Sequence, residues 1–324
     1  MPVLSAESNA NLMHIANAPC SWGILEFEST TLAPAAAQVL DEIAATGYSG
    51  TELGDWGFLP TDAGRLADDL DRRRLALVGA FVDVALTDRA AHDGGEATAL
   101  RTARLLAAAS LFHTSTSSAS AASSVVPPVI VLSDATARDP TRTARAGRIT
   151  PEDSLTSAQW DIVAAGAERI ARAVREATGL RTVFHHHCAT YVETPGDIDA
   201  LMQRTSADLV GLCLDTGHAT FGGGDPVTLV DRYRGRIRHV HFKDCSREIA
   251  DRARAEAWDY VTAVRHGLFC ELGRGEVDFA SVRDRLRAHG YDGWIVVEQD
   301  VLPAMGTPAA SAERNRRFLA GLGL

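Results

Sequence analysis

Histidine, aspartate and glutamate residues end four consecutive apolar segments in the second half of this 324-residue chain. These segments are residues 181–187, 209–215, 237–243 and 293–298. Imidazoles and carboxylates that converge inside a protein lose hydration at high cost unless a cation compensates them. Nitrogen and oxygen donors without a thiolate predict one divalent metal (Mn, Co, Zn, Fe or Mg) and argue against a structural zinc site. The polar residues at these ends are His185, His186, His187, Asp215, His241, Lys243 and Glu298.

The alternation of side chains along a strand divides these residues between two faces. His185 and His187 share one face, and His186 points to the other. His241 and Lys243 also share a face. We expect the faces of His185 and His241 to point toward a common centre.

A short motif, Asp-Thr-Gly-His at 215–218, places Asp215 and His218 three residues apart where a strand gives way to a loop. Gly217 and the glycine run 222–224 would let the backbone approach a ligand closely. The run is more typical of a flexible loop than of a phosphate cradle. Asp-Pro at 225–226 predicts the start of the next helix.

Apolar segments that read as strands alternate with amphipathic segments that read as helices along the whole chain. Eight such pairs in about 300 residues predict a single (β/α)8 TIM barrel, whose active site lies at the carboxyl ends of the strands. A doubly wound open sheet is the alternative, but no GxGxxG follows the first strand. The expected strands are 12–18, 49–53, 75–83, 128–133, 181–187, 209–215, 237–243 and 293–298, and the expected helices are 34–46, 62–73, 95–112, 156–178, 196–204, 226–233, 278–289 and 309–320.

Two segments interrupt this pattern. Residues 113–128 are rich in Ser, Thr and Ala and predict a flexible insertion before the fourth strand. Residues 134–154 are polar, contain two prolines and predict a long loop that could cover the barrel mouth. Neither segment reads as a domain boundary, so we expect one domain over residues 1–324.

The charge balance limits the partners of the chain. Asp and Glu number 42 against 32 Lys and Arg, which gives a net charge of −10. This excludes nucleic acid and anionic membranes as partners held by bulk electrostatics. No apolar run is long enough to span a membrane, and no signal peptide is apparent. Five widely spaced cysteines without a CxxC pair predict reduced thiols and a cytoplasmic protein (Cys20, Cys188, Cys213, Cys245 and Cys270).

Several longer motifs resemble the xylose-isomerase-like TIM-barrel superfamily of sugar isomerases, epimerases and dehydratases, and within it the inosose (2-keto-myo-inositol) dehydratase family. The resemblance runs nearly end to end, apart from residues 113–128. The motifs that carry it are APCSWG at 18–23, GTELGDWGFLP at 50–60, HHHCATYVETP at 185–195, LCLDTGHATFGGGDP at 212–226, HVHFKD at 239–244 and ELGRGEVDF at 271–279.

The resemblance implies one divalent metal, with Mn or Co favoured, held by residues of strands five to eight. Asp215, His241 and Glu298 fall on three ligand positions. Most relatives carry a glutamate on strand five, where this chain has histidines. One alignment makes His185 the fourth ligand, which we favour; the other pairs Glu193 with a second acidic residue of the epimerases and chooses His187.

Further roles follow from the same resemblance. His218 falls on a substrate or supporting position, and Arg247 on a position that binds substrate in ketose epimerases. Glu52 is also expected to hold substrate hydroxyls. Trp22 and Trp56 offer apolar faces to a ring, although packing in the wall explains them at least as well.

The implied reaction is the dehydration of a keto-polyol such as 2-keto-myo-inositol. A base removes the proton α to the ketone, the metal stabilises the enediolate, and the β-hydroxyl leaves. Glu193 or His187 is the candidate base, and Lys243 or His218 the candidate group on the departing oxygen. The alternatives are a metal-dependent isomerase or epimerase of a ketose, a repair nuclease that the net charge disfavours, and a non-catalytic binding barrel. The expected partner is a small polyol or sugar, and a homo-oligomer is compatible with such a barrel.

Overall fold

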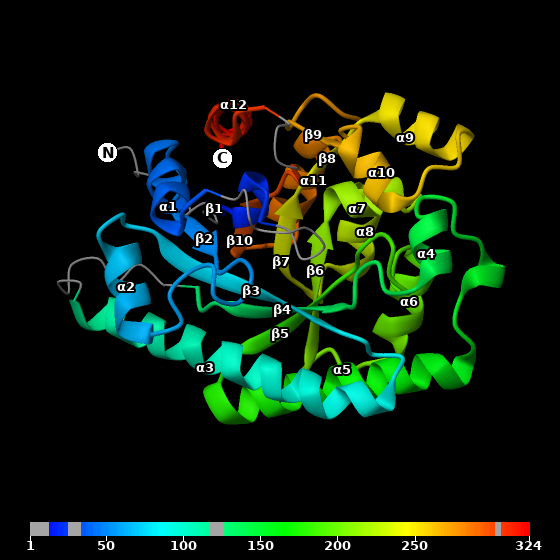
Figure 1. Ribbon diagram of the computed structural model, residues 1–324, viewed down its shortest axis with the longest axis horizontal. Coiled ribbons are helices and arrows are strands. Elements are labelled where there is room, and N and C mark those ends of the chain that lie inside the picture. The colour runs from blue at the N-terminus through cyan, green and yellow to red at the C-terminus, as the bar shows by residue number, and fades with distance from the viewer. Residues whose placement is uncertain (1–12, 25–33, 117–125, 302–305) are drawn as a thin grey trace, which may run out of the picture.

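A closed barrel of eight parallel strands forms the centre of the computed structural model, which describes residues 13–24, 34–116, 126–301 and 306–324 (Figure 1). Each strand pairs with the next along the chain, and the last pairs with the first. This confirms the predicted (β/α)8 barrel and excludes the open sheet. The barrel strands are β1 (His14–Asn17), β2 (Gly50–Glu52), β3 (Ala76–Val84), β4 (Val129–Asp134), β5 (Arg181–His185), β6 (Val210–Asp215), β7 (Ile237–Phe242) and β10 (Trp294–Val297).

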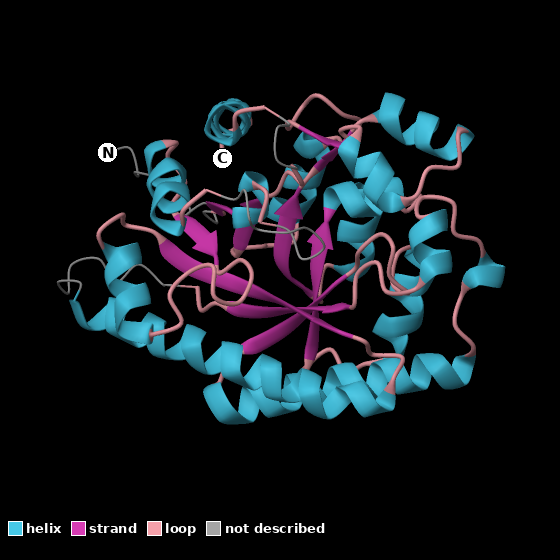
Figure 2. Ribbon diagram, in the orientation of Figure 1, coloured by secondary structure: helices cyan, strands magenta, loops and turns pink. Residues whose placement is uncertain are grey.

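Helices surround the barrel (Figure 2), and at least one helix follows each barrel strand. All eight expected helices are present, with ends within a few residues of the expected ones. They are α1 (Ala36–Ala45), α2 (Ala63–Asp71), α3 (His92–Thr116), α5 (Ser157–Thr178), α6 (Pro195–Arg204), α8 (Pro226–Tyr233), α11 (Phe279–Ala288) and α12 (Pro308–Gly321).

Capping residues explain where several helices begin and end. Asp225 precedes α8 and accepts the amide hydrogens of Val227 and Thr228, as the Asp-Pro pair predicted. Gly47 lies just after α1 and has a φ of +88°, a value that favours glycine at the end of a helix. The start of α1 differs from expectation: Pro34 lies outside the helix, which begins at Ala36.

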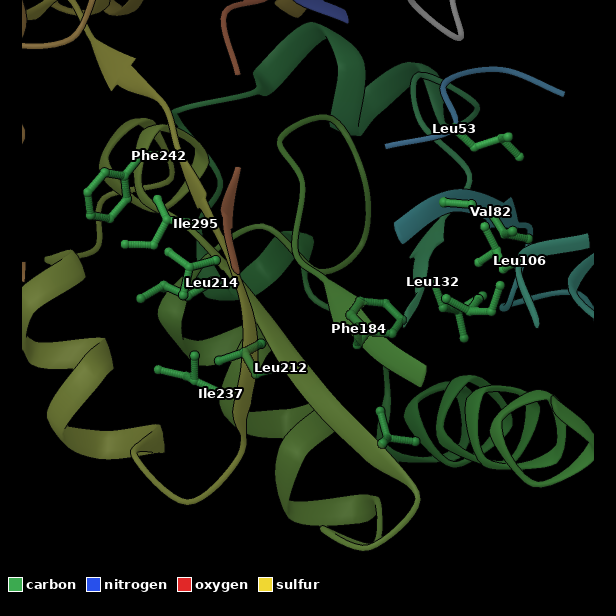
Figure 3. Close-up of a cluster of buried hydrophobic side chains, with 14 of the residues drawn as sticks. Leu53, Val82, Leu106, Leu132, Phe184, Leu212, Leu214, Ile237, Phe242 and Ile295 are labelled. Carbon is green, nitrogen blue, oxygen red and sulfur yellow. The ribbon is translucent and has the colours of Figure 1, made fainter. Parts of the chain in front are cut away.

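The apolar core has two layers. The outer faces of the strands pack against the helices through large side chains, including Phe184, Leu214 and Ile295 (Figure 3). The smaller side chains of Val183 and Cys213 alternate with these and form a separate cluster inside the barrel. This inner cluster lies on the same strand faces as the polar residues at the strand ends.

Several short elements follow the carboxyl ends of β4, β6 and β7 and were not predicted. The segment 134–154, expected to be a loop, contains a short helix and a 3-10 turn, because Asp139 caps a helix that starts at Pro140. The additional elements are α4 (Pro140–Arg145), a 3-10 turn (Pro151–Asp153), α7 (Thr216–Phe221), α9 (Arg247–Ala255), α10 (Tyr260–Arg265) and the antiparallel pair β8 (Asp244–Cys245) and β9 (Phe269–Cys270).

The Ser-rich segment is shorter than expected at its start, since α3 continues through residues 113–116. Residues 117–125 lie outside the described residues. Among the helices that the structure describes, none combines the length and apolar character needed to cross a membrane. The five cysteines are free: Cys188, Cys213 and Cys245 are buried, and Cys20 and Cys270 are half-buried.

Candidate active site

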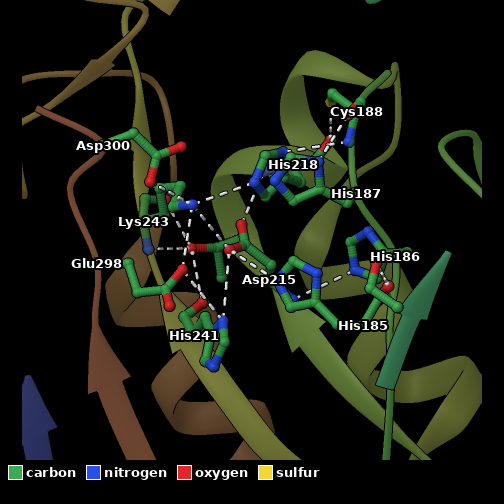
Figure 4. A network of polar contacts seen from close by, with 12 residues as sticks. His185, His186, His187, Cys188, Asp215, His218, His241, Lys243, Glu298 and Asp300 are labelled. Atoms are coloured by element: carbon green, nitrogen blue, oxygen red, sulfur yellow. Dashed lines mark hydrogen bonds and ion pairs between the residues drawn. The ribbon is translucent and has the colours of Figure 1, made fainter. Parts of the chain in front are cut away.

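Four donor side chains from four neighbouring strands meet at the carboxyl end of the barrel (Figure 4). One ligand atom from each lies within 4.8 Å of those of the other three. The Asp215 Oδ2 atom is 3.5 Å from His185 Nε2 and 3.8 Å from His241 Nδ1. All four side chains are buried, and they come from the ends of β5, β6, β7 and β10 (His185, Asp215, His241 and Glu298).

The donor set fits a divalent cation. Asp215 Oδ2 and His241 Nδ1 are buried and have no hydrogen-bond partner among the described residues. Burial raises the pKa of Asp215, but Lys243 and His185 outweigh it and lower the pKa to about 2. His241 and Lys243 likewise hold the pKa of Glu298 well below its usual range, against the effect of burial. Two ionised carboxylates and two imidazoles, with Asp215 Oδ2 and His241 Nδ1 lacking hydrogen bonds, are a suitable environment for a metal ion.

Glu52, at the end of β2, forms hydrogen bonds to His241 of the donor set and to the neighbouring His239. Its Oε1 atom accepts hydrogen bonds from His239 Nε2 at 2.7 Å and His241 Nε2 at 3.1 Å. Burial raises the pKa of Glu52, but His241 and His239 lower it to about 2. The carboxylate expected to hold substrate hydroxyls thus binds two histidines through Oε1, and Glu52 also lines the pocket at this end of the barrel.

Lys243 is buried among acidic groups beside the donor set. Its Nζ atom lies 3.0 Å from Asp300 Oδ1, 3.1 Å from Glu298 Oε2 and 3.6 Å from Asp215 Oδ2. These carboxylates raise the pKa of Lys243 well above its usual range, although burial acts in the opposite direction. Asp300 carries no recognisable motif in the sequence and lies two residues after Glu298, beyond the end of β10.

The rings of His187 and His218 lie against each other next to Lys243, with centroids 3.8 Å apart and planes tilted by 40°. His187 Nδ1 lies 2.6 Å from the carbonyl oxygen of Cys188 and donates to it, so Nε2 is the basic nitrogen of this ring. His218 Nε2 lies 3.1 Å from Lys243 Nζ. Burial, more than the nearby charges, holds the pKa of both histidines well below the usual range, so both rings are neutral.

A pocket opens onto the donor set from the carboxyl end of the barrel. His185, His187 and Lys243 contribute polar groups to its wall. Phe81, which meets the His185 ring edge to face at 6.0 Å between centroids, adds an apolar surface. Cys20 also lines the pocket. Phe81 was not singled out from the sequence, and Cys20, which lies in the APCSWG motif at 18–23, was given no role at a site.

Glu193 does not line this pocket. Its Oε1 accepts the amide hydrogen of Gly147 at 2.7 Å, and its Oε2 accepts that of Ala189 at 2.8 Å. Of the two candidate bases, His187 is the one that lines the pocket. His187 also stays outside the four-donor group, which contains His185.

Three other expected substrate contacts lie away from the pocket. Arg247 is the first residue of α9, pairs with Glu276 at 2.8 Å and leaves 71% of its side chain exposed. Trp22 is buried in the core and donates its indole N–H to Glu42. Trp56 is 40% exposed and lies under the guanidinium of Arg101.

The glycines of the Asp-Thr-Gly-His segment serve close packing. A Cβ atom on Gly217 would lie 2.7 Å from the Lys243 side chain, and one on Gly222 would lie 2.7 Å from the backbone oxygen of Glu193. His186 points away from the donor set, as expected, and its Nε2 accepts the amide hydrogen of Asp215.

Comparison with known proteins places this geometry in context. A family model described as "Xylose isomerase-like TIM barrel" matches residues 40–322. The chain is 31% identical to inosose dehydratase of Lacticaseibacillus casei over 87% of its length and 88% of that protein. It is also 31% identical to inosose dehydratase of Geobacillus kaustophilus, over 97% and 96% of the two chains. A solved structure of L-ribulose 3-epimerase shares the fold with a TM-score of 0.65 at 17% identity, covering 96% of this chain and 94% of that one.

Proposed function

This chain is an inosose dehydratase-like member of the xylose isomerase-like TIM barrel family, and we propose that it is a metal-dependent hydro-lyase that removes water from a keto-polyol such as 2-keto-myo-inositol. The observation that carries the proposal is the convergence of four buried donors beside a basic histidine and a buried lysine. The two inosose dehydratases that the chain resembles direct the choice of substrate.

His185, Asp215, His241 and Glu298 would hold the divalent cation. When bound, the cation would act as a Lewis acid toward the ketone oxygen of the substrate and increase the acidity of the neighbouring C–H bond. Glu52 orients His241, because its hydrogen bond to Nε2 leaves Nδ1 as the donor atom.

His187 is the proposed base for the proton α to the ketone. It lines the pocket, it is neutral, and its Nδ1–H is already donated to the Cys188 carbonyl. The Nε2 atom would therefore accept the proton. A positioned base of this kind contributes about 10²–10⁴-fold to the rate.

Lys243 is the proposed acid for the departing β-hydroxyl. As that C–O bond breaks, a proton from the ammonium group completes a water molecule, and a C=C bond forms between the two carbons. Asp300 keeps the ammonium in place from the far side. His218, 3.1 Å from the same nitrogen, is positioned to share in this proton transfer.

Metal analysis followed by a substrate panel tests the proposal. We expect purified protein to carry about one divalent ion, chelation to abolish turnover, and Mn or Co to restore it. Mass spectrometry of 2-keto-myo-inositol and common ketoses after incubation should show loss of water from the keto-polyol. A product of unchanged mass would indicate an isomerase or epimerase instead, and full activity of metal-free protein would contradict the metal site.

A further inference from the structure

The turn that follows β5 is held by a hydrogen bond from its backbone to the carboxylate of Glu193. The His187 amide donates to the carbonyl oxygen of Val192 at 3.0 Å, so residues 187–192 form a compact loop. Inside it, Ala189 adopts a left-handed conformation with a φ of +65°. This conformation costs a non-glycine residue about 1–2 kcal/mol, so other contacts must hold it.

Glu193 supplies such a contact from the position directly after the loop. Its side chain is 1% exposed, and Oε2 accepts the Ala189 amide at 2.8 Å. The other oxygen accepts the amide of Gly147, which belongs to the segment after α4. Both oxygens therefore bind backbone, and the loop that begins with His187 is tied to a second segment of the barrel mouth.

From this geometry we infer that Glu193 is a positioning residue: its two amide contacts hold the strained turn at Ala189 and thereby set the place of His187 in the pocket. The inference rests on the proposed function only where it treats His187 as the base. It assigns Glu193 a role without direct contact to substrate.

Other contacts hold the same loop and allow a variant at Glu193 to fold. Arg142 is buried, donates to the carbonyl oxygen of Thr190 at 2.7 Å and pairs with Asp197 at 2.9 Å. Tyr191 donates its hydroxyl to Asp139 at 2.7 Å. Loss of one of the two Glu193 contacts should therefore shift the turn without unfolding the protein.

Glu193→Gln tests the inference by kinetics. A glutamine offers one amide oxygen and a donor –NH2, so it cannot accept both amide hydrogens. We expect kcat to fall roughly ten- to hundredfold with a smaller change in KM, because a small displacement of a catalytic group has an effect of this size.

A second substitution separates positioning from proton transfer. Ala189→Gly permits the left-handed turn without support from the carboxylate, so Ala189→Gly in the Glu193→Gln background should recover at least half of the lost activity on a logarithmic scale. If Glu193 were itself the base, glycine at 189 would restore nothing. Absence of rescue, or unchanged kcat in Glu193→Gln, would overturn the inference.

Hydrogen exchange of the peptide that spans residues 186–194 gives a readout that does not depend on turnover. Glu193→Gln should raise its exchange rate, and the double variant should lower it again. The matched control is Glu168→Gln, which alters a carboxylate that accepts the Ser206 amide at the outer surface. If the wild-type protein dehydrates no keto-polyol, the proposed function fails, whereas unchanged exchange in Glu193→Gln refutes the positioning role by itself.

Discussion

The Oε1 atom of Glu52 accepts a hydrogen bond from Nε2 of His241 across 3.1 Å. The other ring nitrogen, Nδ1, lies 3.2 Å from Oε2 of Glu298, inside the donor group. A histidine that binds a metal through one nitrogen commonly donates the other N–H to a carboxylate, which fixes its tautomer and orientation. The hydrogen bond between these two residues thus links the end of β2 to the donor set.

Glu52→Gln is expected to weaken metal binding by about 10–100-fold, since the amide accepts more weakly and carries no charge. Competition with a chelator of known affinity would measure the loss. Asp62→Asn, which alters the cap of α2 after the same strand, is the matched control and should leave metal affinity unchanged. Equal affinity of Glu52→Gln and wild type would contradict the supporting role.

Asp215→Asn should remove stoichiometric metal and leave the fold intact. The Oδ1 atom of Asp215 caps α7 by accepting the His218 amide at 2.7 Å, and an asparagine oxygen can replace it. The Oδ2 donor becomes an –NH2 group and cannot bind a cation. Metal content and circular dichroism of the purified variant would measure the two effects, with Asp225→Asn at the α8 cap as control. Retained stoichiometric metal would exclude Asp215 from the ligands.

Glu193 should make stability depend on pH. Burial raises the pKa of Glu193 to about 7, although the amides of Gly147 and Ala189 and the charge of Arg142 lower it and Asp197 raises it further. The folded protein therefore keeps a proton that the unfolded chain releases between about pH 4.5 and 7. Over this window the contribution of Glu193 to the free energy of unfolding falls as pH rises, by at most about 1.4 kcal/mol per pH unit.

Urea unfolding at pH 5 and pH 7.5 would measure this dependence. The stability of wild type should fall relative to that of Glu193→Gln between the two pH values. Arg148, which also faces this carboxylate, stays charged throughout and should not alter the sign. A constant difference between the two proteins would show that Glu193 does not titrate in this range.

Arg142→Met should destabilise the protein by about 3–5 kcal/mol, because it leaves the buried carboxylate of Asp197 without its partner. Chemical unfolding would measure the loss. The double variant with Asp197→Asn should lose less than the single one, since it removes the uncompensated charge. An equal loss would mean that the packing of the side chain, and not the ion pair, provides the stability.

Arg247→Ala should leave KM within about twofold of wild type and change stability by less than about 1 kcal/mol, because an exposed ion pair contributes little. Steady-state kinetics on the keto-polyol and a thermal melt would measure both. A large rise in KM would show instead that α9 brings Arg247 to the substrate.

The barrel could be predicted from the sequence because its strands are short apolar runs and its helices have clear polar faces. Alternation also placed His185, His241 and Lys243 on one side of their strands. Alternation could not decide whether His185 or His187 is the metal ligand, since both side chains lie on the same side of the strand. The structure separates them: β5 ends at His185, whereas His187 already belongs to the turn.

The roles of Glu193 and Arg247 could not be predicted, because they depend on contacts with residues that are distant in the sequence. Glu193 binds the amide of a residue 46 positions away, and such a contact has no signature in spacing. Arg247 is the first residue of α9, pairs with Glu276 and leaves most of its side chain exposed. The extra helices after β4 and β7 were missed because α4 and α10 have six residues each, too few for a periodic stripe, and α9 buries only Ala250 and Ala253.

The absence of a side chain at Gly217 limits which residues position 217 can accept. The aliphatic stem of Lys243 crosses the α carbon of Gly217 so closely that even a methyl group there would occupy the same space. Any larger residue would push the ammonium out from between Asp300 and Glu298 and leave two acids facing each other in the barrel. Glycine at this position thus makes room for the stem of Lys243, and a larger residue at 217 should be tolerated only if that stem moves.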